Sequence, residues 1–307
     1  MKFARDLDGA CLCPAGSVLT IGAFDGLHRG HQALIQRVCE QAEASQLSAA
    51  LVSFEPLPRE YFKRESLIRI LPAAAKLALL QRSGLDLTVL LRFNAALAAL
   101  SAREFVERVL VRRLAAREVW VGHDFAFGRG RSGTFATLQE LGAEFSFAAY
   151  AFPRVDFNGE RVSSSALRKA LLAADFAHAA ALLGRPYSYS RSVIRGKQLG
   201  RTLGFPTANL PWPQESAQMS GIYAVWVSGA GLHRHPAVAS LGTRPTVAGI
   251  EPLLEVHLLD FDGDLYGQRL EVEFVAKQRE EWHLPSLEAL KAQIALDAQQ
   301  ARAILGA

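Results

Sequence analysis

The sequence predicts two domains of different class: an N-terminal Rossmann-like α/β domain over residues 1–184, and a small antiparallel β-barrel with a terminal helix over residues 185–307. Up to about residue 184, apolar strand-like runs alternate with amphipathic helical stretches, which is typical of a parallel sheet covered on both faces. After Pro186 the strand-like runs become short and are separated by Gly, Pro and Asp. A chain of 307 residues is long enough for two cores.

In the first domain, buried strands and helices follow one another in order. The run SVLTIGAF (17–24) reads as a buried strand and is followed by helical spacing over 31–44. Further strands are predicted at 48–54, 86–93, 117–122 and 144–152, and helices at 71–84 and 101–115, the second with Ser101 as its N-cap. Two short helices are expected over 163–186.

The second domain is predicted to consist of strands with one helix at the end. The strand-like runs lie at 187–196, 222–229, 235–242, 253–261 and 270–277, and helical spacing returns only over 286–305. No internal repeat is present. This order favours a small antiparallel β-barrel with one C-terminal helix.

Composition is that of an ordinary soluble globular protein, with 50% hydrophobic and 21% charged residues. The net charge of +4 suits anionic ligands such as nucleotides but is too diffuse to indicate nucleic acid. The N-terminus lacks the apolar core of a signal peptide, and no run is long enough to span a membrane. Cys11, Cys13 and Cys39 form an odd, sparse set that suits a reducing cytoplasm, and no second Cys/His pair with zinc spacing accompanies them. We expect a monomer or a weak homo-oligomer.

Two histidines lie where the first strand gives way to a helix, in GAFDGLHRGH. His28 and His31 can be read as a metal pair, as helix-end residues without a role, or as phosphate donors. The metal reading lacks the HExxH pattern and a third ligand. Gly26 and Gly30 let the backbone approach a ligand, and the helix N-terminus presents free N–H groups, so the glycine spacing favours an α-phosphate. Fixed donors there would stabilise the charge that builds up during nucleotidyl transfer.

This stretch resembles the His-x-Gly-His nucleotide-binding motif of the nucleotidylyltransferase superfamily. A second part of that pattern, small hydroxyl residues followed by Arg at a helix start, is matched by RVSSSALR at 161–168. The resemblance implies that His28 and His31 act at the α-phosphate of ATP and that Arg168 reaches the β- and γ-phosphates. It also implies a nucleotide-binding set of Gly22, Phe24, Asp25, Gly26, Gly30, Ser163, Ser164 and Ser165.

A glycine-rich segment further on could be mistaken for a dinucleotide fingerprint. Gly128, Gly130 and Gly133 have GxGxxG spacing, but five residues separate them from the preceding strand run and the loop is rich in arginine, which argues against NAD(P). The longer string VGHDFAFGRGRSG, like FEPLPREYF at 54–62, resembles flavin-side segments of the prokaryotic bifunctional riboflavin kinase/FAD synthetase family. That resemblance implies flavin contacts from Phe62, Asp124 and Phe127.

The barrel carries a second signature, GKQLGRTLGFPTANL at 196–210, which resembles that of the family's riboflavin kinase domain. No G-x-x-x-x-G-K-[ST] loop is present, so ATP is not held by a P-loop. Backbone amides of a flap would wrap the phosphates instead, with Gly196, Lys197, Gly200 and Gly204 as nucleotide-binding residues. Thr207 and Asn209 lie two apart on an extended segment and offer oxygen ligands for Mg²⁺. A Gly/Pro-rich hairpin connection would explain the glycines but not Thr-Ala-Asn.

The base of the kinase reaction is assigned by resemblance to Glu255. Alternation in LLEVHLLDF places Leu254, Val256 and Leu258 on one face and Glu255 and His257 on the other. A carboxylate there can accept the proton of the riboflavin 5′-hydroxyl, although a solvent-facing strand Glu is the ordinary alternative. VAKQREE continues the resemblance and implies a flavin contact from Arg279. The sequence departs from the family pattern at Arg191, Arg195 and Ser240, and before the last helix, where Lys-Phe is missing.

The resemblance implies two reactions, both with Mg²⁺. The barrel would convert riboflavin and ATP to FMN and ADP, and the α/β domain would convert FMN and ATP to FAD and pyrophosphate. One alternative is that only one activity is retained. Another is a non-catalytic flavin-binding sensor or a nucleic-acid-binding barrel, which lacks the expected clusters of Lys/Arg and aromatic residues. No membrane partner is expected.

Overall fold

The computed structural model describes residues 1–62, 69–196, 199–213, 219–246 and 249–307. Its contacts divide the chain into two compact units. The N-terminal unit ends at Ser163, and the C-terminal unit runs from Ser164 to Ala307 with a short piece around Ile70. The predicted domain boundary at 184/185 therefore stays a prediction, because contacts group the two short helices after Ser163 with the barrel.

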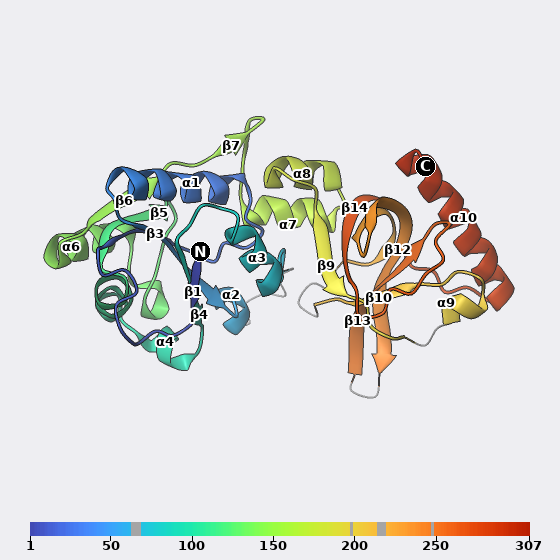
Figure 1. Cartoon of the computed structure of the whole chain (residues 1–307), viewed down its shortest axis with the longest axis horizontal. Coiled ribbons are helices and arrows are strands. Elements are labelled where there is room, and N and C mark those ends of the chain that lie inside the picture. Colours follow the sequence, from blue (N-terminus) through green and yellow to red (C-terminus); the bar gives the residue numbers. More distant parts are fainter. Residues whose placement is uncertain (63–68, 197–198, 214–218, 247–248) are drawn as a thin grey trace. The chain divides into compact units, whose positions relative to one another are not determined.

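The N-terminal unit is built on a parallel six-stranded sheet, as predicted (Figure 1). Its order is β1 (Lys2–Ala4), β4 (Leu87–Arg92), β3 (Ser48–Glu55), β2 (Ser17–Ile21), β5 (Ala116–Gly122) and β6 (Ala148–Phe152). From β2 the chain steps outward to β3 and β4 and then returns to β5 on the other side of β2. Ligands bind at the carboxyl ends of strands where the order reverses, and GAFDGLHRGH leaves β2 at that point.

The helices of this unit include the three predicted stretches at 31–44, 71–84 and 101–115, and several others that were not predicted. They are α1 (Arg29–Ala44), α2 (Pro58–Tyr61), α3 (Ala73–Leu80), α4 (Ala95–Ala99), α5 (Ala102–Phe105), η1 (Val106–Arg113), η2 (Arg129–Arg131) and α6 (Phe135–Phe145), with a small hairpin of β7 (Asp156–Phe157) and β8 (Glu160–Arg161). Ser101 caps α5 as predicted, accepting from the Glu104 N–H at 3.2 Å. The predicted continuous α-helix over 101–115 is wrong, since η1 is a π-helix.

The C-terminal unit holds an antiparallel six-stranded sheet in the order β10 (Ala208–Pro211), β13 (Gly249–Leu258), β12 (Leu232–Thr246), β11 (Gly221–Gly229), β14 (Arg269–Arg279) and β9 (Ser188–Ser192). The two edges approach each other through a bridge in which Ile194 N–H donates to the Asn209 carbonyl at 2.8 Å. The sheet is thus a nearly closed barrel, as predicted.

The described residues of this unit form the helices α7 (Ser164–Leu172), α8 (Phe176–Leu183), α9 (Leu199–Thr202) and α10 (Leu287–Leu305). The prediction that the barrel has no helix before its end is wrong, because α9 follows the first barrel strand. Phe176 of α8 packs into an aromatic cluster with Tyr187, Tyr223 and Phe274, with ring centroids 5.4–6.3 Å away. Ala301 of α10 packs against Ile222, Ala224, Val238 and Leu259. None of the helices in the described ranges is long and apolar enough to cross a membrane.

Candidate functional site

The loop between β2 and α1 has an unusual backbone. Phe24 and Leu27 adopt left-handed conformations, with φ of 48° and 45°, and Gly26 lies between them with φ of 85°. Phe24 and Asp25 are buried, and the Gly22 N–H donates to the Val52 carbonyl at 3.0 Å. Such conformations in non-glycine residues cost energy and persist only where packing holds them, which is common at ligand-binding loops.

His28 is the N-cap of α1. Its Nδ1 accepts from the His31 N–H at 3.3 Å, so in the neutral ring the proton resides on Nε2. The two imidazoles stack with centroids 3.6 Å apart and planes 13° from parallel. A Cβ at residue 30 would lie 3.3 Å from the His28 ring, so Gly30 provides the room in which that ring packs over the helix start. The loop thus places both rings together at the N-terminus of a 16-residue helix.

His31 is held in the neutral form. Burial lowers its pKa well below the usual value, and the nearby His28 and Lys76 add to that effect. Its Nδ1 is buried and has no hydrogen-bond partner among the described residues. A group of three or more His, Cys, Asp or Glu side chains suited to a metal ion is absent from the described ranges.

Lys76, which the sequence analysis did not single out, supports this loop. It is 2% exposed, and its Nζ donates to the Ala23 carbonyl at 3.1 Å and to Ser53 Oγ at 3.0 Å. A third bond reaches the Phe54 carbonyl at 3.5 Å. Lys76 therefore joins the loop after β2 to the end of β3. The signal was a single charged residue in the apolar helical stretch PAAAKLALL.

The second half of the predicted nucleotide motif lies at the start of α7. Ser163 precedes the helix, Ser164 and Ser165 are in its first turn, and Arg168 follows one turn later. Arg168 is buried, which is uncommon for an arginine. Ser163 belongs to the N-terminal unit and the others to the C-terminal unit, so their joint action with the histidines stays a prediction.

The predicted flavin residues of the N-terminal unit occupy three different settings. Phe62 is 47% exposed, with its ring edge-on to Tyr61 and Phe93. Asp124 is exposed and pairs with Arg161, which lowers the pKa of its carboxyl, and His123 adds to the effect. Phe127 is buried and stacks on Phe125 at 5.2 Å.

The GxGxxG spacing has a packing explanation. A Cβ at Gly128 would lie 2.7 Å from the Ala102 backbone nitrogen, and one at Gly133 would lie 2.8 Å from the Phe127 ring. These glycines let the loop after β5 pack against α5, so a dinucleotide site is not needed to account for them.

In the C-terminal unit, the predicted base and one predicted metal ligand are direct neighbours. Glu255 of β13 is paired with Asn209 of β10 on one side and with Ser240 of β12 on the other. Directly opposite residues project to the same face of a sheet, so all three side chains share a face. Thr207, two residues before Asn209, comes just before β10.

The side chain of Asn209 fits the role of an oxygen ligand. It is 4% exposed, and its Oδ1 is buried without a hydrogen-bond partner in the part of the chain that the structure describes. Gly196 covers the amide: a Cβ there would lie 2.7 Å from Nδ2 and 3.0 Å from Oδ1. A buried carbonyl oxygen left without a donor suits a hard cation such as Mg²⁺. Lys197, beside Gly196, lies outside the described residues.

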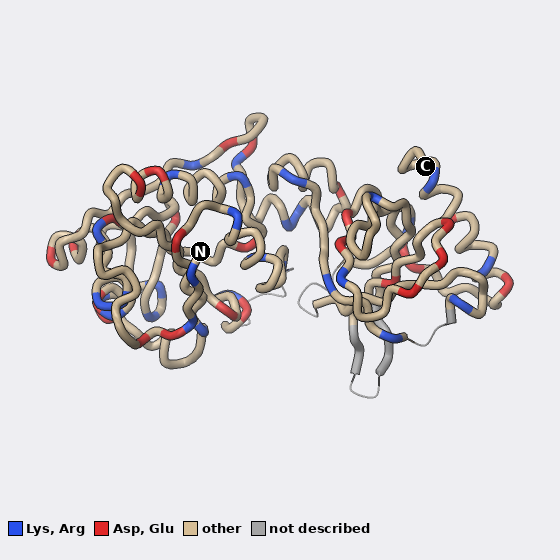
Figure 2. Tube along the Cα trace, viewed as in Figure 1, with Lys and Arg blue, Asp and Glu red and all other residues tan. Residues whose placement is uncertain are grey.

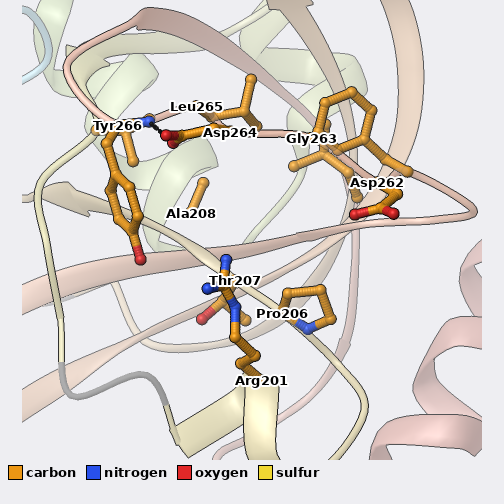
Figure 3. Close-up of a pocket in the computed structure, with 12 residues that line it drawn as sticks. Arg201, Pro206, Thr207, Ala208, Asp262, Gly263, Asp264, Leu265 and Tyr266 are labelled. Atoms are coloured by element: carbon orange, nitrogen blue, oxygen red, sulfur yellow. Dashed lines mark hydrogen bonds between the residues drawn. The ribbon is translucent and has the colours of Figure 1, made fainter.

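A pocket of about 390 Å³ opens beside Thr207 (Figure 3). Its lining comes from the segment between β9 and β10, from β10, and from the end of β13 and the loop after it. It includes Arg201, Pro206, Asp262, Asp264 and Tyr266. Gly200 and Gly204 belong to a tight turn that precedes Pro206. The Phe205 N–H donates to the Gly200 carbonyl at 2.8 Å, and Gly204 has φ of 89°. Arg195, one of the residues that depart from the family pattern, has its guanidinium 5.2 Å from the centre of the Tyr266 ring.

Glu281 lies near Glu255, and Arg279 lies near Glu281. The carboxylate of Glu281 lies against Gly242, two residues along β12 from Ser240, because a Cβ at Gly242 would overlap it. Burial raises the Glu281 pKa, and the nearby Glu255 raises it further. The sequence analysis missed Glu281. Arg279 donates to both carboxylate oxygens of Asp297 on α10, at 2.9 and 2.6 Å, and stacks on Trp282.

Comparison with known proteins identifies both units. Residues 12–166 match the family model described as FAD synthetase, and residues 183–305 match the one described as riboflavin kinase. The chain belongs to the bifunctional riboflavin kinase/FMN adenylyltransferase family. It is 43% identical over 308 residues to the Escherichia coli K12 protein of that name, covering 100% of this chain and 98% of the relative. It is 46% identical to the Pseudomonas fluorescens protein, covering 99% and 98%.

A solved structure has the same fold over the whole length. It comes from Streptococcus pneumoniae, is 28% identical and has a TM-score of 0.81, covering 98% of each chain. That protein is named a macrolide-efflux protein. Since both family models and the curated relatives agree on flavin enzymes, that structure is compared for its architecture alone.

Proposed function

We propose that the two sites described above carry the two reactions of this family, with the residues assigned from the sequence in the roles predicted for them. The chain is an enzyme that makes FMN from riboflavin and ATP, and FAD from FMN and ATP. The observation that best supports the residue assignment is the pairing of Glu255 with Asn209 at the point where the barrel closes.

For adenylyl transfer, the stacked histidines would bind the α-phosphate of ATP. The Nε2–H of His28 is a donor of known position, because Nδ1 already caps the helix. As the FMN phosphate attacks the α-phosphorus directly, negative charge grows on the α-phosphate, and this donor and the helix N-terminus stabilise it. Arg168 would contact the β- and γ-phosphates and Ser163, Ser164 and Ser165 would add hydroxyl donors. Phe62, Asp124 and Phe127 would position the flavin.

For phosphoryl transfer, Glu255 would accept the proton of the riboflavin 5′-hydroxyl. Thr207 and Asn209 would hold Mg²⁺, which when bound neutralises charge on the ATP phosphates. The buried, unpartnered Oδ1 of Asn209 supports that role. ATP would occupy the pocket beside Thr207, under a flap that includes Gly196, Gly200 and Gly204. Arg279 would face the flavin from β14.

The proposal also covers the cellular compartment, the ligands and the oligomeric state of the protein. The three cysteines are free, which suits work in a reducing cytoplasm. Basic and acidic residues are interspersed over each unit, which supports small anionic substrates over nucleic acid (Figure 2). We keep a monomer or weak homo-oligomer as the expected state.

The direct test is incubation of the chain with riboflavin, ATP and Mg²⁺, with flavins resolved by chromatography. His28→Ala and His31→Ala should each cut FAD formation strongly while FMN formation continues, because both rings lie in the N-terminal unit. His233→Ala, at an exposed imidazole of the C-terminal unit, is the matched control and should change neither product. Loss of a stoichiometric metal as the main effect of these substitutions would support metal binding by the histidines instead. If the unmodified chain makes FMN but no FAD, only the kinase activity is retained.

A further inference from the structure

A basic pocket lies in the N-terminal unit away from the histidines. It measures about 240 Å³ and is lined by Leu7, Asp8, Gly9, Arg108, Arg112 and Arg113. Arg113 comes just before β5, and the Leu114 carbonyl accepts from Ser17 Oγ at the start of β2 at 2.7 Å. Strands β2 and β5 are parallel, so this is the amino edge of the sheet, whereas GAFDGLHRGH leaves from the carboxyl edge.

The π-helix η1 creates this arrangement. Hydrogen bonds from i to i+5 widen the turn, so Arg108 and Arg113, five residues apart, fall on the same side of the helix. In an α-helix with 3.6 residues per turn, residues five apart would be rotated away from each other. Short π-helical stretches are frequent at functional sites.

Arg113 is buried, and no carboxylate of the described residues pairs with its guanidinium. The residue is 8% exposed, and the bond from Nη1 to the Ala10 carbonyl is the only hydrogen bond that its side chain makes within the described residues. The Nε is buried and has no partner there. A guanidinium carries five N–H donors and is always charged, so a buried Nε–H without a partner is costly.

The neighbouring carboxylates are already engaged. Asp8 accepts from Arg108 Nη2 with both oxygens at 2.8 Å, and Glu107 accepts from Arg112. Three arginines therefore face two carboxylates, which leaves one positive charge in excess at the pocket. The unmatched charge is the buried one, where an anion would gain most because screening is weakest.

We propose that this pocket binds a small phosphate-class oxyanion, inorganic phosphate or pyrophosphate, through the guanidinium of Arg113 with Arg112 at its rim. Its volume limits the ligand: sites for drug-sized molecules measure roughly 300–1,000 Å³, so a pocket of this size excludes a flavin nucleotide. Paired N–H groups of Arg match the oxygens of a tetrahedral anion. Gly9 is required for the geometry, since a Cβ there would lie 2.8 Å from Arg113 Nη1.

Binding to the full chain can be separated from binding at the catalytic sites. Calorimetric titration with pyrophosphate, and separately with phosphate, is carried out without ATP, flavin or Mg²⁺. In the His28→Ala/His31→Ala background, one site should remain, and Arg113→Gln in that background should weaken it at least tenfold. Arg82→Gln removes one charge from an exposed loop position and should leave the affinity unchanged.

Variants and crystallography cover the case in which Arg113→Gln fails to fold. Arg112→Gln is a surface change and should weaken binding several-fold, and Gly9→Ala should weaken it by displacing the guanidinium. Crystals of the full chain soaked in selenate should show an anomalous peak beside Arg113. Equal affinity in Arg112→Gln, Gly9→Ala and the unmodified pocket, or no anomalous peak there, would overturn the proposal. A response to phosphate alone or to pyrophosphate alone would identify which of the two anions the pocket takes.

Discussion

At the residue scale, the ionisation of His31 couples the adenylylation loop to pH. Its pKa is lowered by burial first, and then by the nearby His28 and Lys76, so the folded state binds a proton less readily than the unfolded chain. Below about pH 6.5 the unfolded chain takes up the proton first, and stability is lost as pH falls through that range. Each unit by which the folded pKa lies below the unfolded one corresponds to about 1.4 kcal/mol.

We therefore expect the melting temperature of the full chain to fall between pH 7.5 and 5.5, and His31→Gln to flatten that dependence. Thermal unfolding followed by circular dichroism across this range measures it. His233→Gln, at an exposed position, should keep the slope of the unmodified chain. A slope that does not change in His31→Gln would mean that His31 titrates alike in both states.

The roles of Glu255 and Asn209 separate in kinetics. Glu255→Gln keeps size and hydrogen bonding but removes the base, so the rate of phosphoryl transfer should fall, typically on the order of 10²–10⁴-fold, with ATP binding little changed. Asn209→Ala should instead raise the Mg²⁺ concentration needed for half-maximal rate. Single-turnover measurements with FMN adenylylation as the internal control distinguish them. A wild-type rate for Glu255→Gln when chemistry limits turnover would remove Glu255 as the base.

Sequence motifs indicated the residues that lie in short contiguous patterns and missed those that reach the site from elsewhere. His28, His31 and Glu255 stand inside recognisable strings. Lys76 comes from a helix 45 residues after His31, and Glu281 follows a different strand from Glu255. The lone charge at Lys76 marks the position but not its partner, and no pattern marks Glu281, because their effects arise from contacts between residues far apart in the sequence. Folding brings Lys76 to Ala23 and Glu281 to Gly242.

At the element scale, the periodicity of apolar residues predicted the positions of helices and strands well, but it did not predict their internal geometry. The strand over 17–24 and the helix after it match β2 and α1, because burial imposes a clear period. The helix over 101–115 has apolar residues at spacings that α- and π-helices both tolerate. The sequence therefore does not show that the α-helix α5 gives way to the π-helix η1 at Val106. The register shifts in β14 also leave no mark in an alternating sequence.

The flap offers an element-scale prediction at Gly196. Its backbone lies on the Asn209 amide, so the Cβ of Gly196→Ala would push either the flap or the amide away. Kinase activity should then require more Mg²⁺–ATP, by several-fold, while FAD formation from supplied FMN is unchanged. Titrations of both activities measure this. Gly122→Ala, whose Cβ meets nothing within 4 Å, should leave the kinase unaltered, and an equal effect of both substitutions would contradict the close contact.

At the scale of the whole molecule, the two activities should be separable, because each unit has its own sheet and core. The predicted boundary at 184/185 and the contact boundary at 163/164 differ by the helices α7 and α8. All proposed kinase residues lie between 196 and 279, and are present in fragments that begin at either place. Both fragments should therefore phosphorylate riboflavin, and neither should make FAD, since His28 and His31 are missing.

The two fragments should differ in stability. A fragment from Arg185 loses Phe176, which is buried against Tyr187, Tyr223 and Phe274, and exposes those rings to water. Burial of one large apolar side chain is worth about 1.5–3 kcal/mol. At roughly 3–6 °C per kcal/mol for a unit of this size, the fragment from Arg185 should melt several degrees below the fragment from Ser164. Phe176→Ala in the longer fragment should reproduce most of that loss. Equal melting temperatures would show that α8 does not stabilise the barrel, and a folded fragment without kinase activity would show that the barrel needs the N-terminal unit for catalysis.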